Sequence, residues 1–138
     1  MKTGYLDPDV AYLLGLLVAR GELQETGLII HFPKGALIAE GESTKFNTNK
    51  EIQLGIDKIR DRISDLLGAD IKRVDSGDSW DLVASTTKKT IAWRNIGRLL
   101  EDKTDFPHFD IPTIFLDKNT PQILKIEFMR GYADVSGN

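Results

Sequence analysis

The sequence predicts an α+β domain with a mostly antiparallel sheet. Two pairs of strand-like segments alternate with helical segments, an order that favours hairpins packed against helices. The 138 residues are 41% hydrophobic, which is enough for the core of one domain. The third observation is an internal sequence repeat. Residues 13–21 and 129–137 align without a gap, which indicates a repeated helix.

The first helix is predicted from its two ends and its apolar interior. Asp7 is an N-cap candidate, and Pro8 stands at the first helical position, where its missing N–H is tolerated. Residues 9–20 are apolar nearly all round, so we expect the helix to be buried on more than one side. Gly21 is expected to end the helix in the left-handed conformation.

Runs of apolar and β-branched residues, bounded by turn residues, predict four strands in two hairpins. The strands are expected at residues 27–32, 36–40, 69–74 and 80–85. The two turns are expected at 33–35 and 75–79, and a polar loop over 41–48 follows the first hairpin.

Two further helices are expected, one after each hairpin. Residues 49–67 carry isoleucine and leucine at spacings of four and three residues, which is a helical stripe opposite a charged face. Residues 88–101 carry a similar apolar set. The chain from 102 to 119 is expected to be irregular because it contains two prolines.

The end of the chain repeats the features of the first helix. Thr120 and Pro121 repeat the N-cap and proline of Asp7 and Pro8, and the last helix is expected to run to Ser136. A helix of this kind normally leads into another unit, so we expect the chain to be a fragment.

The repeat divides the chain into two parts. Residues 1–119 are interpreted as one unit with its linker, and residues 120–138 as the first helix of a truncated second unit. Small residues on the two repeated helices would let the backbones approach closely. We therefore expect a helix–helix interface at Gly15, Ala19, Gly131 and Ala133.

Composition narrows the range of functions. Eighteen Lys and Arg against 21 Asp and Glu leave a net charge of −3, so no extreme charge indicates a nucleic-acid or acidic-lipid partner. The absence of cysteine excludes a disulfide framework, an iron–sulfur cluster and a thiol nucleophile, and two histidines argue against a histidine-rich metal site. No membrane span or secretory signal is recognisable, so a cytoplasmic or nucleoid-associated location is expected.

The two aligned nonapeptides resemble the signature of the LAGLIDADG homing-endonuclease family. They read LLGLLVARG at residues 13–21 and MRGYADVSG at residues 129–137, and residues 111–115 are similar to a family linker. The resemblance covers the whole chain, because the family unit is ordered helix, two strands, helix, two strands, helix. It implies a curved antiparallel sheet in the DNA major groove, two motif helices packed at a dyad or pseudo-dyad, and acidic residues that hold Mg²⁺ before each closing glycine.

The sequence departs from the family pattern at both acidic positions. Arg20 precedes Gly21, and Ser136 precedes Gly137. A guanidinium repels Mg²⁺, and a neutral hydroxyl is a poor ligand for it. We therefore assign no residue to catalysis or metal binding, and expect a motif that has kept helix packing but lost cleavage.

The function expected from the resemblance is binding of duplex DNA through the open sheet face, without a required cofactor. Basic side chains would contact phosphates, and polar side chains would read base edges. A plain solvated strand face is the alternative, because acidic residues lie nearby, and Arg20 could equally favour the helix dipole. The candidate DNA-binding residues are His31, Lys34, Lys45, Lys72, Arg73, Lys88, Lys89 and Arg20.

Two other functions stay open. A metal-dependent homing-type or restriction-type endonuclease, or a fragment of one, would need Mg²⁺ and carboxylates at unusual offsets, for which Glu22 and Asp134 are the candidates. A protein-association domain would use the last helix to form a homodimer or to hold the second half of a longer chain. The acidic charge balance favours this third function.

Overall fold

The fold is taken from a computed structural model of the chain. It describes residues 6–24, 27–33, 45–68, 70–85, 91–101, 103 and 109–136. For the helical residues 45–53, 91–93 and 136, it describes the backbone only.

Helix α1 (Pro8–Arg20) begins as the sequence predicts. The Asp7 carboxylate accepts a hydrogen bond from the backbone N–H of Val10 at 2.8 Å, a cap that stabilises a helix by about 1 kcal/mol. The helix is buried from Val10 to Val18, which explains its apolar character on nearly every side.

The expected left-handed conformation of Gly21 is wrong. Its φ of −111° and ψ of 165° are extended, because the chain passes from α1 directly into strand β1 (Gly21–Gln24). A methyl group at Gly21 would lie 2.5 Å from the Cα of Leu17. Glycine is needed here for the close approach of the strand to the preceding helical turn.

The described strands form one antiparallel sheet in the order β1-β2-β4-β3. Besides β1, they are β2 (Gly27–Pro33), β3 (Ile71–Asp75) and β4 (Ser79–Ser85). The second hairpin is confirmed, and the Asp75 carboxylate closes its turn by accepting from the N–H of Gly77 at 3.0 Å. Gly77 has a φ of +91°, which favours glycine.

The first hairpin differs from the prediction. Strand β2 pairs with β1 on one side and with β4 on the other, so the preceding segment supplies its hairpin partner. The strand expected at 36–40 lies outside the described residues. The short segment GELQ was overlooked because only Leu23 among its residues is a large apolar side chain.

The three remaining helices have partly different bounds from those expected. Helix α3 (Lys45–Leu67) begins four residues before residue 49, inside the expected polar loop, and Ile56 and Ile63 of its stripe are buried. Helix α4 is described over Ile91–Leu99, since residues 88–90 of the expected helix lie outside the described residues, and the chain leaves it at Glu101 with a φ of 60°. Helix α5 (Gln122–Ser136) lies where the sequence places it, after a 3₁₀ turn at Thr113–Phe115.

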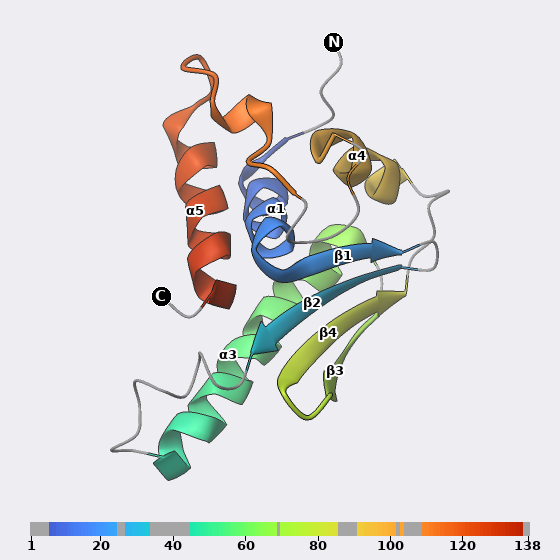
Figure 1. The fold of residues 1–138 in the computed structure, drawn as a ribbon, viewed down its shortest axis with the longest axis vertical. Coiled ribbons are helices and arrows are strands. Elements are labelled where there is room, and N and C mark those ends of the chain that lie inside the picture. Colours follow the sequence, from blue (N-terminus) through green and yellow to red (C-terminus); the bar gives the residue numbers. More distant parts are fainter. Residues whose placement is uncertain are drawn as a thin grey trace.

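The helices gather on one face of the sheet (Figure 1). Alternate strand residues, among them Ile30, Phe32 and Leu82, are buried on this helix-facing side. Within the described residues, no helix or strand covers the opposite side, which we call the open face. The α+β class with an antiparallel sheet is therefore confirmed. Of the helices in the described ranges, none has the length and apolarity needed to cross a membrane.

Candidate nucleic-acid interface

Helices α1 and α5 approach each other at backbone distance. A methyl group at Gly15 would lie 2.0 Å from the carbonyl oxygen of Phe128, and one at Gly131 would lie 2.1 Å from that of Tyr12. Both distances are far below any allowed van der Waals contact. Glycine is therefore required at both positions for this helix–helix contact.

The contact repeats with a constant offset along the chain. Gly15 faces the backbone of Phe128 and Tyr132, and Gly131 faces the backbone of Tyr12 and Leu16. In each case the α5 residue follows its α1 counterpart by 116 residues: Gly131 follows Gly15, Phe128 follows Tyr12, and Tyr132 follows Leu16. With both helices running toward the same end of the molecule (Figure 1), this pattern describes a local pseudo-twofold relation.

The two alanines expected at this interface, Ala19 and Ala133, are not counterparts in the repeat. Ala19 and Ala133 are both half-buried. By the 116-residue offset, the counterpart of Ala19 is Val135, which is fully buried. Sequence reasoning passed over Val135 because a valine does not signal close packing.

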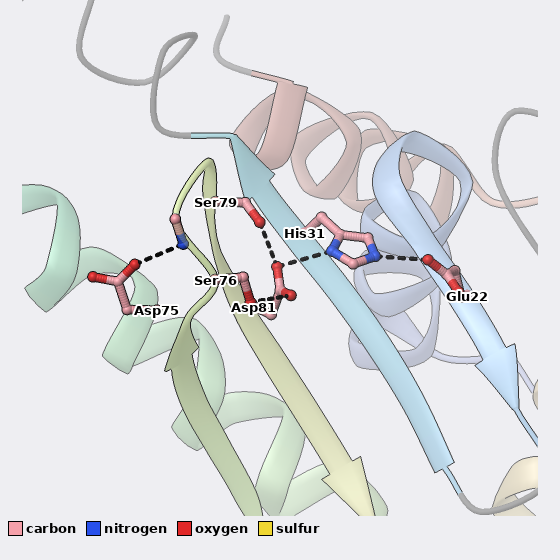
Figure 2. Close-up of polar contacts among 7 residues, drawn as sticks. Glu22, His31, Asp75, Ser76, Ser79 and Asp81 are labelled. Carbon is pink, nitrogen blue, oxygen red and sulfur yellow. Dashed lines mark hydrogen bonds and ion pairs between the residues drawn. The ribbon is translucent and has the colours of Figure 1, made fainter.

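The open face carries a three-residue polar network centred on His31 of β2 (Figure 2). Its Nε2 lies 2.7 Å from a carboxylate oxygen of Glu22 on β1, and its Nδ1 lies 2.8 Å from one of Asp81 on β4. The sheet register explains the meeting, because Asp81 is directly opposite His31, and Glu22 is diagonal to it through Ile29.

The electrostatics of this network favour the charged forms. Burial alone would lower the pKa of His31, but the hydrogen bonds with Glu22 and Asp81 raise this pKa above its ordinary value. Burial would raise the pKa of Asp81, but it is lowered because the hydroxyls of Ser79 and Ser76 and the ring of His31 donate to the carboxylate. The two carboxylates therefore favour the imidazolium form of His31 over the neutral ring.

The structure places the predicted basic residues in different environments. Lys72 is exposed and lies on the open face, opposite Val83. Arg73 faces the helices instead, opposite the buried Leu82, and its Nε donates to the Asp57 carboxylate of α3 at 2.8 Å. The assignment of Arg73 to the open face is therefore wrong, because consecutive residues of a strand point to opposite sides.

The other candidate contacts are only partly described. Arg20 is the last residue of α1 and is half-buried. Lys34, Lys88 and Lys89 lie outside the described residues, and Lys45 is described by its backbone at the start of α3. On the open face, the described strands place the charged residues Glu22, His31, Lys72 and Asp81. These do not form a basic stripe.

Asp134 belongs to a separate cluster at the contact of α1, α3 and α5. Its carboxylate accepts a 2.6 Å hydrogen bond from the hydroxyl of Tyr12, which is 3% exposed. Burial and the Asp134 carboxylate together raise the pKa of Tyr12. The Arg62 guanidinium lies 4.1 Å from the centre of the Tyr12 ring and donates to the buried Glu127 at 3.0 Å.

The ion pair between Arg62 and Glu127 in this cluster could not be predicted from the sequence. Arg62 and Glu127 are 65 residues apart, and no local pattern couples them. Within the described ranges, no group of three or more His, Asp or Glu side chains is arranged to hold a metal ion. The two acidic candidates, Glu22 and Asp134, thus both serve as hydrogen-bond acceptors for other side chains.

Comparisons of the chain with protein-family models, curated proteins and solved structures found no match in any of the three.

Proposed function

We propose that this chain is a LAGLIDADG-like unit that binds duplex DNA through the open face of its sheet and does not cleave it. The observation that carries the proposal is the contact of Gly15 and Gly131 with each other's helix. The family resemblance implies two motif helices packed in this way. The element order α1, β1–β2, α3, β3–β4, α4 agrees with the unit that the resemblance implies.

The open face supports binding by its geometry. Strands β2 and β4 alternate buried apolar residues with residues that point away from the helices, so the open face carries the polar His31 and Asp81 beside the apolar Ile29 and Val83. Strands of this kind can read the DNA major groove. Lys72 is the described basic residue placed to contact a phosphate there.

The surroundings of the acidic candidates support the absence of cleavage. Arg20 occupies the position at which the resemblance implies an acid. Glu22 is bonded to His31, and Asp134 is bonded to Tyr12. A cytoplasmic or nucleoid location is part of the same proposal.

Exposed apolar side chains on the outer face of α5 favour a second unit in the DNA-binding assembly. Ile126, Met129 and Tyr132 are 43%, 68% and 45% exposed. Their α1 counterparts, by the 116-residue offset, are Val10, Leu13 and Leu16, each at most 4% exposed. We propose that a second unit covers the outer face of α5, as the first unit buries these residues of α1. This face also favours protein–protein association as a second candidate function.

Binding of a random-sequence DNA duplex, measured by fluorescence anisotropy at several salt concentrations, tests the main proposal. The variant Lys72→Glu should weaken binding several-fold and reduce the salt slope by about 1. Lys58→Glu on the exposed side of α3 makes the same change in net charge and should leave binding unchanged. Equal effects of the two variants would contradict the assignment of the open face, and DNA cutting in Mg²⁺ would contradict the absence of cleavage.

A further inference from the structure

We propose that His31 is a proton-controlled clamp on the open face, which holds Glu22 when the ring is protonated and releases it when the ring is neutral. The clamp joins three adjacent strands, since Glu22 lies on β1, His31 on β2 and Asp81 on β4 (Figure 2). Its effect on DNA binding rests on the proposed function, whereas the clamp itself does not.

The hydrogen-bond geometry requires both ring nitrogens to donate. Ionised carboxylates are acceptors only, and each ring nitrogen of His31 has one of them within 2.8 Å. A neutral imidazole has a single N–H, so it can satisfy only one of these two carboxylates. The other carboxylate would then face a nitrogen lone pair, which is repulsive.

The surroundings decide which arm of the clamp opens. Asp81 also accepts hydrogen bonds from Ser79 at 2.7 Å and from Ser76 at 2.8 Å, so its position is fixed independently of His31. Among the described residues, Glu22 has its hydrogen bond with His31 alone, and its side chain is 36% exposed. Loss of the proton therefore leaves the bond to Asp81 in place and frees the Glu22 carboxylate.

The freed carboxylate changes the charge of the surface on which DNA is proposed to lie. The charged groups around His31 on the open face are Glu22 on β1, Asp81 on β4 and, beyond Asp81, Lys72 on β3. With His31 protonated, one carboxylate of the pair is neutralised. With His31 neutral, both are uncompensated and repel DNA phosphates.

The direction of the pH dependence follows from the network. Because the two carboxylates raise the pKa of His31 above 6.5, the switch operates above that pH. DNA affinity should fall as the pH rises through the His31 pKa, by roughly threefold for the loss of one charge at a half-exposed site.

Two measurements test the clamp and its consequence separately. The first is an NMR titration of the His31 ring, assigned with a His31→Gln variant, from about pH 5.5 to about pH 9. Glu22→Gln should lower the His31 pKa, because an amide can donate to the neutral ring. Asp78→Asn, in the exposed turn, removes an acidic group elsewhere and should leave this pKa unchanged. A His31 pKa at or below 6.5, or no change in Glu22→Gln, would overturn the clamp.

The second measurement is DNA affinity over the same pH range at constant ionic strength. The parent should lose affinity as pH rises, whereas Glu22→Gln should bind nearly equally at all pH values. Equal pH dependence in the two proteins would overturn the regulatory role. No binding by either protein at low salt would overturn the proposed function, while the NMR titration would still decide whether the clamp exists.

Discussion

Helices α1 and α5 are equivalent at their mutual contact but differ on their outer faces. Leu13 of α1 is fully buried, whereas its counterpart Met129 of α5 is 68% exposed. The glycine pattern therefore determines how the two helices meet, and the rest of the chain determines what covers each of them. A repeated motif predicts a shared contact more reliably than a shared environment.

The largest effect is expected from adding a side chain at the glycine contact between α1 and α5. Gly15→Ala or Gly131→Ala should destabilise the fold by about 3 kcal/mol, because each new methyl group would collide with a carbonyl of the opposite helix. Gly55→Ala in α3 is the matched control, since no atom lies within 4 Å of its methyl position. It should stabilise the protein by about 1 kcal/mol through helix propensity. Urea denaturation measures all three changes, and a Gly15→Ala protein as stable as the parent would contradict the contact.

The difference between the outer faces of α1 and α5 can be tested by shortening one side chain on each helix. Leu13→Ala should cost about 3 kcal/mol of unfolding free energy, because it leaves a cavity in the hydrophobic core. Met129→Ala should change the unfolding free energy by less than about 0.5 kcal/mol in the isolated chain. Similar losses in the two variants would mean that α5 is covered in solution.

The hydrogen bond between Tyr12 and Asp134 gives a smaller test of the same contact. Tyr12→Phe removes the hydroxyl but keeps the ring beneath Arg62, and should cost about 1 kcal/mol of stability. Asp134→Asn keeps an acceptor oxygen and should cost less. If Asp134→Asn leaves stability unchanged but abolishes a metal-dependent cleavage activity, the structural role of this residue is wrong.

The pH dependence of stability is the smallest expected effect. Because the folded pKa of His31 is above its ordinary value of 6.5, protonation stabilises the folded state fully below about pH 6.5. This stabilisation is lost as the pH rises through the folded pKa. The melting temperature should therefore fall by a few degrees over this interval, and a His31→Gln variant should show a smaller fall. An equal fall in both proteins would assign the effect to other groups.

Much of the fold could be predicted from local signals. Capping residues and apolar spacing located α1, α5 and most of α3, and a glycine turn located the second hairpin. Strand β1 was missed because it is short and largely polar, and Gly21 was misread because its close approach to Leu17 is a tertiary feature.

The candidate site was harder to predict because it depends on strand register. Glu22 and His31 were both candidates, but their contact with each other and with Asp81 requires the pairing of three strands. Lys72 and Arg73 lie on opposite faces of the sheet, because consecutive strand residues alternate, and this much follows from the sequence alone. The Arg62 and Glu127 pair depends on packing between distant helices, which no sequence pattern indicates.

The central claim is that this chain recognises duplex DNA without cutting it. A binding selection on a random duplex pool in the presence of Mg²⁺, scored for both retention and cleavage, tests it most directly. We expect retention of a defined set of duplexes with intact strands, and weaker retention of the same set by the Lys72→Glu variant. Cleaved products, or no retained duplex even at low salt, would contradict the account.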